Sequence, residues 1–246
     1  MKGGATLALG AGFLLLLWAE RRRPLRRPVQ PDAARVPGNL LAGAAAALTV
    51  AVTQTPLVQP LALRVEKHRL GLVPRLGLSP AGATLLALVL LDYTLYLWHV
   101  LLHRALWRWH RFHHADRDLD TSTALRFHAM ELLWSLPWRA AQVLLIGVTP
   151  RQLKLWSQLT GAEVMFHHSN LRLAPPLERA LGWLVVTPAL HGVHHADRER
   201  LQHANLSSGL TVWDRLHGTY LRVEQPDRVT IGLPREEAAH ALARQP

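Results

Sequence analysis

The chain has 246 residues, of which 49% are apolar, and carries a formal net charge of +11 at pH 7. It contains no Cys, which excludes disulfides, thiolate zinc sites and iron–sulfur clusters held by its own side chains. A net positive charge of this size is typical of proteins that bind nucleic acid or an anionic membrane surface. Because the Arg residues gather beside apolar runs, we interpret the charge as membrane-facing and expect no nucleic-acid partner.

The first apolar run occupies residues 3–19 and contains no charged side chain. As a helix it would span roughly 26 Å, which is close to the thickness of the bilayer hydrocarbon. A cleavable signal peptide fits poorly, because "ERRRPLRRP" follows directly without a small-residue cleavage site. Five Arg lie between Arg21 and Arg27, and the positive-inside rule predicts that this loop is cytoplasmic.

Three further runs are apolar enough to enter a membrane. They lie at residues 36–63, from residue 76 through "AGATLLALVLLDYTLYLWHVLLH", and at residues 132–148. The run at 36–63 contains Pro56 and Pro60, so it either spans with a kink or dips and returns. Helical patterns dominate throughout, so we predict an all-α integral membrane protein with about four transmembrane helices.

One histidine motif occurs twice, as "HRFHHAD" at 110–116 and as "HGVHHAD" at 191–197. Histidine is the commonest metal ligand in its neutral form. If the third run continues as an unbroken helix, five imidazoles share an arc of about 100°: His99, His103, His110, His113 and His114. The rings of His191, His194 and His195 share another face, and spacings of three and four suit ligation of one metal from one helix.

A buried histidine cluster without metal would have to stay neutral, and each ring would need its own hydrogen-bond partner. A metal satisfies many imidazoles together, so we predict a metal site. Eight imidazoles exceed the ligands of one tetrahedral zinc and suit two ions, although imidazole alone permits zinc, copper, iron or nickel. Asp92 and Tyr96 fall on the same helical stripe, and we expect Asp92 to fix a ring tautomer.

These residues resemble the sterol desaturase / fatty acid hydroxylase superfamily of membrane di-iron enzymes. The three boxes of that family correspond to "HVLLH", "HRFHH" and "HGVHH". "DYTLYLWHVLLH" is similar to its lead into the first box, "TALRFHAMELL" to its RxHxxE element, "FHHSN" to its histidine-Ser-Asn element and "NLSSGLTVWDRLHGTY" to its closing segment. The resemblance covers roughly residues 80–221. Two departures are Ala129, where the family has Pro, and Leu206-Ser207, where it has an aromatic residue and Gly.

The resemblance implies that the box histidines bind two iron ions, with zinc as a possible substitute in purified protein. Including the histidines of the other two elements, the implied ligands are His99, His103, His110, His113, His114, His128, His168, His191, His194 and His195. Residues expected just behind the ligands are Asp92, Tyr96, Glu131 and Asn170. We expect structural roles for His167, His203 and His217, and solvated positions for His68 and His240.

The predicted organisation is an N-terminal part with spans and a basic loop at 1–75, a histidine-box catalytic domain at 76–221 and a polar tail at 222–246 with a short solvated helix. The resemblance implies hydroxylation of a lipid or sterol-like substrate with O₂. Because the boxes follow the end of the third span, we expect the site to face the cytoplasm. Because the chain has no Cys for a ferredoxin centre, we also expect a separate electron donor, a ferredoxin or a cytochrome with its reductase. Alternatives are a desaturase with the same site, a zinc-dependent membrane hydrolase, and a non-enzymatic scaffold or metal-storage protein.

Overall fold

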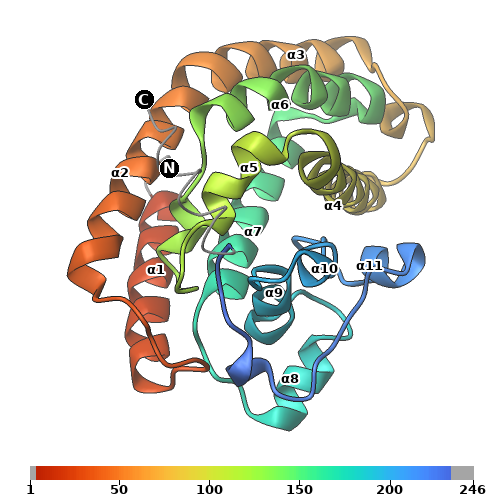
Figure 1. Cartoon of the computed structure of the whole chain (residues 1–246). Helices are drawn as coiled ribbons and strands as arrows, with labels where there is room; N and C mark the ends of the chain where they lie inside the picture. The colour runs from red at the N-terminus through yellow and green to blue at the C-terminus, as the bar shows by residue number, and fades with distance from the viewer. Residues whose placement is uncertain (1–3, 234–246) are drawn as a thin grey trace.

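The computed structural model describes residues 4–233, and its regular elements are helices (Figure 1). The α-helices are α1 (Gly4–Arg22), α2 (Asp32–Thr49), α3 (Thr55–His68), α4 (Pro80–Ala105), α5 (Trp107–His114), α6 (Ala129–Ala141), α7 (Pro150–His168), α8 (Pro175–Leu181), α9 (Pro188–His194), α10 (Glu199–Gln202) and α11 (Val212–His217). Short π- or 3₁₀-segments are η1 (Val50–Gln54), η2 (Val73–Arg75), η3 (Thr123–Leu125), η4 (Gln142–Gly147) and η5 (Pro226–Arg228). Within residues 4–233, extended pairing is limited to isolated bridges, which confirms the all-helical prediction.

The run at 36–63 forms one long helical path, α2–η1–α3, that bends (Figure 1). The bend lies at the π-helical turn η1, where the Thr55 N–H bonds to the Val50 carbonyl five residues earlier. Pro56 follows directly and has no N–H to offer the preceding turn, so the hydrogen-bond ladder shifts there. The structure therefore has the predicted kink, and the crossing of a membrane by this run stays a prediction.

Helix α4 is the long apolar helix that leads into the histidine site. Its start is fixed by Ser79, whose side chain accepts the Gly82 N–H, and by Pro80 at the first helical position. Its 26 residues extend about 39 Å. Within the described residues, two stretches are long and apolar enough to cross a membrane, Asp32–Arg75 and Pro80–Ala105. The total of about four spans stays a prediction.

The apolar core lies where α3, α4, η4 and α7 meet. It contains Val58, Ala62, Val65, Val73, Ala87, Leu91, Val143, Ile146, Val148 and Trp156. At its edge the turn after α3 packs backbone against backbone on the end of η4, through Gly71 and Gly147. Both glycines have positive φ, and a Cβ on Gly71 would lie 2.4 Å from Gly147 Cα, so only glycine fits there.

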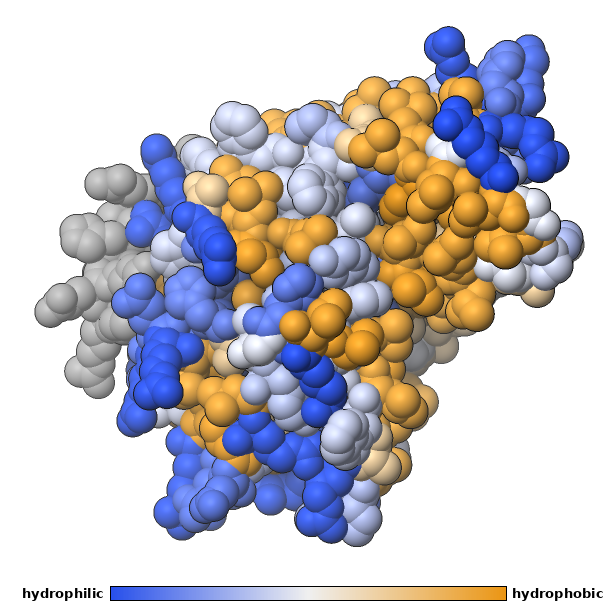
Figure 2. Space-filling view, turned by 90° about the vertical axis from the view of Figure 1, so that its right-hand side faces the viewer, coloured by the Kyte–Doolittle hydropathy of each residue, from blue (hydrophilic) through white to orange (hydrophobic). Residues whose placement is uncertain are grey.

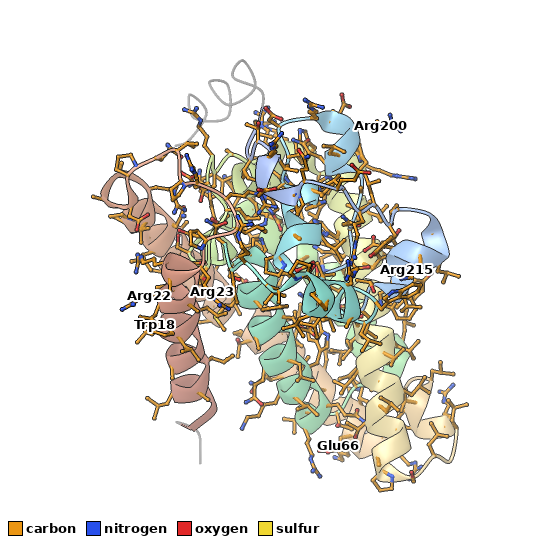
Figure 3. All side chains as sticks on the ribbon, turned by 90° about the horizontal axis from the view of Figure 1, so that it is seen from below. Trp18, Arg22, Arg23, Glu66, Arg200 and Arg215 are labelled. Carbon is orange, nitrogen blue, oxygen red and sulfur yellow. The ribbon has the colours of Figure 1, made fainter. Side chains whose placement is uncertain are left out.

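Helices α1 and α7 lie side by side, and the loop after α1 returns to the end of α7 (Figures 1 and 3). The Leu25 N–H donates to the Asn170 carbonyl, and the Arg172 N–H donates to the Arg23 carbonyl. Buried Glu20 accepts the backbone N–H groups of Thr121 and Asn170. These bonds fasten the N-terminal helix to the segments that carry the histidines.

Helices α4 and α5 are not one helix, which corrects the expectation of an unbroken run through His114. Leu106 lies between them with φ −118° and ψ 18°, outside helical geometry. The chain turns there, so that the His103 and His110 ring centroids lie 5.0 Å apart.

The side of the molecule that carries α4 has a broad apolar surface, with hydrophilic side chains gathered mostly beside it (Figure 2). Exposed large apolar residues of α3, α4 and the turn between them include Leu63, Leu72, Leu76, Leu78 and Leu85. Apolar surface of this extent belongs in contact with lipid or a partner rather than water.

Candidate metal centre

Nine of the ten predicted ligands lie in two adjacent groups of buried histidines. The first histidine group is His99, His103, His110, His114 and His194. The second histidine group is His113, His168, His191 and His195. In each group the potential ligand nitrogens all lie within 4.8 Å of one another. The rings come from α4, α5, α7 and α9, with His195 immediately after α9 (Figure 1).

The two copies of the motif meet face to face, which explains why the chain contains both. The His114 and His195 rings stack with centroids 4.2 Å apart, and His114 lies 4.7 Å from His194. Each His-His doublet gives one ring to each group: His114 and His194 to the first, His113 and His195 to the second. Two adjacent histidines that contribute to different groups suit a pair of neighbouring metal ions.

Helix α9 is short, and its start is fixed by local sequence. The Thr187 side chain accepts the Leu190 N–H, and Pro188 occupies the first helical position. All seven residues of α9 are buried. Arg26 packs so closely on Gly192 that a Cβ there would lie 1.8 Å from a guanidinium nitrogen. A larger residue between the ligands would have to displace the Arg26 guanidinium from this position.

Backbone carbonyls and one carboxylate orient five of the nine rings through Nδ1. The acceptors are Leu206 O for His99 (2.7 Å), Arg126 O for His113 (3.0 Å), Val164 O for His168 (2.7 Å), Ala204 O for His194 (3.0 Å) and Glu131 for His110 (3.1 Å). A carbonyl can only accept, so the facing Nδ1 must carry the proton. In a neutral ring the Nε2 atom is then left with a free lone pair.

These bare Nε2 atoms face one another at short range. The distance is 2.9 Å between His113 and His168, and 3.1 Å between His99 and His110. With both Nδ1 atoms protonated, no proton remains to join two neutral Nε2 atoms, so two lone pairs would repel. A cation between them removes the repulsion. Nitrogens bound to one metal at about 2.1 Å lie roughly 3.0–3.4 Å apart, close to these distances.

Burial keeps the rings neutral. It lowers the pKa of His110 and of His113 to about 3, and neighbouring histidines reinforce the effect at His113. Burial, followed by the repulsion of nearby rings, also lowers the pKa of His114, His194 and His195 well below the usual value. Neutral imidazole is the form that binds a metal, so the site is ready to bind at neutral pH.

Several buried ring nitrogens have no hydrogen-bond partner among residues 4–233. Both nitrogens of His103, His114 and His195 are in this state, as is Nε2 of His194. Buried polar atoms in folded proteins are normally satisfied. A donor set of imidazoles that is buried, neutral and unpartnered fits a transition metal, so the residues present fit the metal that the sequence implies.

A chain of polar contacts supports the first histidine group from behind. Asp214 accepts the Leu206 N–H (2.8 Å) and the Thr219 hydroxyl (2.7 Å), and Thr219 contacts the Tyr96 hydroxyl (3.2 Å). Leu206 in turn accepts the His99 Nδ1–H. Tyr96 lies behind the ligands as predicted from the sequence, whereas the supporting roles of Asp214 and of the carbonyls were not predicted.

Glu131 is the one predicted carboxylate that contacts a ligand. It lies 3.1 Å from His110 Nδ1 at the start of α6, and burial raises its pKa to about 7 although His113 and His128 oppose the shift. A carboxylate behind a metal-binding imidazole fixes the ring and increases its basicity.

Three predicted site residues lie elsewhere. Asp92 accepts the Trp213 indole N–H (2.7 Å) and the Leu210 N–H (3.1 Å), so it braces the closing segment rather than a ring. Asn170 bonds to both backbone groups of Arg26, which fastens the loop after α1. His128 belongs to neither group; its Nδ1 accepts the Met130 N–H and caps α6. The structure therefore places His128 at the start of α6 and not with the nine grouped rings.

The histidines expected to be structural or solvated differ in their distance from the site. His167 is buried with its ring 4.1 Å from His191, so it packs directly behind the second histidine group. His203 is exposed at 5.7 Å from His103, and His217 is exposed beside Tyr96. His68 is exposed at the end of α3, as predicted. His240 and the predicted C-terminal helix lie outside the described residues.

The beginning of the predicted polar tail packs on the second motif. Ile231 is buried and bridges to Ala196, and the Gly232 N–H donates to the His195 carbonyl (2.9 Å). Residues 229–233 therefore form part of the site's enclosure, which the polar composition of the tail did not indicate.

Comparison with known proteins places this arrangement in a family. The chain is 30% identical over 169 residues to ornithine lipid hydroxylase OlsE of Rhizobium tropici, an alignment covering 67% of this chain and 49% of that protein. It is 28% identical to alkylglycerol monooxygenase of Xenopus tropicalis and 27% identical to that of Homo sapiens, each alignment covering 58% of this chain and 31% of the relative. No solved structure matches the chain.

The chain thus spans half or less of the length of these relatives. The sequence model for fatty acid hydroxylase matches residues 84–219, which include both histidine groups, all but the first turn of α4, and the whole of α5, α7 and α9. With that match over more than half of the sequence, the chain belongs to the fatty acid hydroxylase family.

Proposed function

We propose that the protein is a membrane-bound di-iron oxygenase that hydroxylates an unactivated C–H bond of a lipid, one iron held by each histidine group. The observation that carries the proposal is the pairing of bare Nε2 atoms at 2.9–3.1 Å in both groups. Family membership and the names of the relatives support a lipid as the substrate class. When bound, two irons would supply O₂ activation and abstraction of hydrogen from carbon.

The chain's own residues would hold the metal and keep its ligands in place. Carbonyls and Glu131 hold protons on the five Nδ1 atoms, which directs the Nε2 lone pairs inward. Nearly complete burial of the rings excludes bulk water from the site. This exclusion favours oxidation of the bound lipid over side reactions with solvent.

A pocket of about 370 Å³ reaches the first histidine group and offers a route for the substrate. Its lining combines His103 with the apolar side chains of Leu97, Val100 and Leu206, and Arg104 lies among them. Leu97 and Val100 belong to α4, the candidate span with the apolar surface. We propose that an acyl or alkyl chain enters from the bilayer along α4 and places a carbon near His103.

The proposed orientation places the site at the cytoplasmic side. Arg26, within the Arg-rich loop, packs against Gly192 between two ligands, so loop and site share one end of the molecule. The positive-inside rule assigns such a loop to the cytoplasm. A separate electron donor, ferredoxin or cytochrome with its reductase, would approach there, and the domain limits 1–75, 76–221 and 222–246 remain part of the proposal.

The test is a turnover assay with the purified chain in lipid nanodiscs, loaded anaerobically with ferrous iron. The assay supplies reduced ferredoxin, isotopically heavy O₂ and a total membrane lipid extract. We expect lipid products that carry one heavy oxygen atom. Products that lack a pair of hydrogens without gaining oxygen would indicate the desaturase. Products whose new oxygen atom comes from water, formed with zinc as the only metal and without O₂, would indicate the hydrolase instead of the oxygenase.

A further inference from the structure

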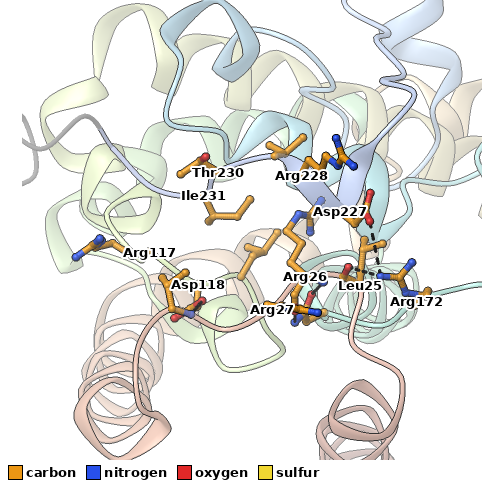
Figure 4. A pocket seen from close by; sticks show the side chains of 14 residues that line it. Leu25, Arg26, Arg27, Arg117, Asp118, Arg172, Asp227, Arg228, Thr230 and Ile231 are labelled. Carbon is orange, nitrogen blue, oxygen red and sulfur yellow. Dashed lines mark hydrogen bonds and ion pairs between the residues drawn. The ribbon is translucent and has the colours of Figure 1, made fainter.

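A second pocket, of about 520 Å³, lies behind α9 and outside the histidine site (Figure 4). The loop after α1, the turn after α5 and the segment after η5 line it. Its charged lining residues are Arg26, Arg27, Arg117, Asp118, Arg172, Asp227 and Arg228, five positive and two negative. The family model matches residues 84–219, so the pocket residues of the loop after α1 and those from Asp227 to Ile231 lie outside the matched region.

Arg26 is the central feature of this pocket. Its residue is 7% exposed, and its Nε and both Nη atoms have no hydrogen-bond partner among residues 4–233. Figure 4 shows its side chain extending toward Arg228 within the pocket. A buried guanidinium with five unsatisfied donor hydrogens is costly unless an anion meets it.

The nearby carboxylates form no hydrogen bond with Arg26, although Asp227 and Glu178 attract its charge. Glu178 instead accepts the Thr187 hydroxyl. Asp118 already accepts the backbone N–H groups of Val29 and Gln30 (both 2.8 Å). Asp227 lies 4.0 Å from Arg172 and forms no ion pair with Arg26 within that distance. Arg172 itself donates to the Leu25 and Pro24 carbonyls, so it builds the wall of the pocket.

The remaining lining favours a tetrahedral, multiply charged anion. Arg27, Arg117 and Arg228 are exposed at the rim, and the lining has a net charge of +3 from five Arg and two Asp. Planar guanidinium groups bind phosphate oxygens in pairs, which gives both strength and geometry. We propose that this pocket binds a phosphate group, with Arg26 as its buried anchor.

The phosphate can come from a lipid headgroup or from a soluble phosphate. The loop follows α1 directly, at the level where a basic segment meets the headgroups of the cytoplasmic leaflet. Arg26 also touches Gly192, which follows His191 of the second histidine group. The bound phosphate would therefore be separated from that group by Arg26 and α9. The site does not depend on the proposed reaction, so it can be tested on binding alone.

The experiment measures thermal unfolding of the full chain in neutral detergent by Trp fluorescence. Three probes are titrated at constant ionic strength: inorganic phosphate, a short-chain phosphatidic acid, and the matching diacylglycerol that lacks phosphate. We expect phosphatidic acid, inorganic phosphate or both to raise the unfolding temperature with concentration, and the diacylglycerol to have no comparable effect. Stabilisation by phosphatidic acid alone identifies a headgroup, and stabilisation by inorganic phosphate identifies a soluble ligand.

Matched variants assign the effect to the pocket. Arg26→Gln should weaken binding about tenfold or more, whereas Arg23→Gln, the same charge change on an exposed neighbour outside the pocket (Figure 3), should leave it unchanged. Arg228→Gln at the exposed rim should weaken binding about threefold and keeps the test decisive if Arg26→Gln does not fold.

Equal affinities in Arg23→Gln and in either pocket variant would overturn the proposal. So would the absence of stabilisation by both phosphate probes.

Discussion

The molecule has two buried regions of opposite chemistry. Where α3, α4, η4 and α7 meet, residues such as Leu91, Val65 and Val143 are at most 1% exposed and aliphatic. Where α4, α5, α7 and α9 meet, His114, His194 and His195 are buried to the same degree. Helices α4 and α7 contribute to both regions, so one helix passes from an apolar interior into an imidazole interior.

The difference shows what holds each region together. Aliphatic side chains are stabilised by packing alone and need no partner. Buried imidazoles lose hydration and repel through facing lone pairs, so packing alone makes that region unstable. We infer that the histidine region depends on its metal ions for stability and that the apolar region does not.

The largest effect is expected for removal of one ligand from each histidine group. His113→Ala and His194→Ala should each abolish turnover and lose one iron per chain, while membrane insertion survives because the apolar region is intact. His68→Ala, at an exposed position on α3, is the matched control and should change neither. Metal analysis and the lipid assay check this; normal turnover in either ligand variant would refute the assignment.

A truncation in the other region should have the opposite pattern. Leu91→Ala removes a fully buried side chain from α4 and should lower the free energy of unfolding by about 2–5 kcal/mol. Metal content should stay near wild type, because Leu91 is two turns from His99 on the same helix. Denaturant titration and metal analysis test whether the two regions are independent. Loss of iron in this variant would show that metal binding depends on packing in the apolar region.

The carboxylate behind His110 offers a finer test. Glu131→Gln keeps an acceptor for the ring N–H but removes the negative charge, so iron affinity should fall about 10- to 100-fold at the first histidine group. The second histidine group should keep its iron. Competition with a chelator would reveal one weakened and one unchanged site; equal weakening of both would show that the groups are not independent.

The smallest effect concerns pH and the metal-free protein. His110 and His113 have folded-state pKa values lowered to about 3, so the unfolded chain binds more protons between pH 6.5 and 3. Stability should therefore fall as pH falls through this window, because protonation of these rings favours the unfolded chain. Glu20, Glu131 and Glu163, each with its pKa raised to about 7, act in the opposite direction, but the histidines with lowered pKa values outnumber them. A thermal-unfolding series at pH 4–7 checks the sign, and a rise in stability on acidification would contradict it.

Residue type and spacing could predict the helical fold and the eight box histidines, and the family resemblance added His168, the ninth ring in the two groups. They could not separate His128 from His167, because only the chain's path shows that His128 caps α6 while His167 packs behind His191. Spacing also cannot reveal a partner such as the Leu206 carbonyl, 107 positions from His99. The sequence has no Pro or Gly at Leu106 that would predict the break between α4 and α5. Because of this break, the five imidazoles of the two helices do not lie along one helical face but belong to two groups.

Anomalous X-ray scattering at the iron edge, from crystals of the iron-loaded chain, tests the central claim most directly. The account predicts two iron peaks, one among the Nε2 atoms of His99 and His110 and one between those of His113 and His168. One peak alone, or peaks away from both histidine groups, would contradict it.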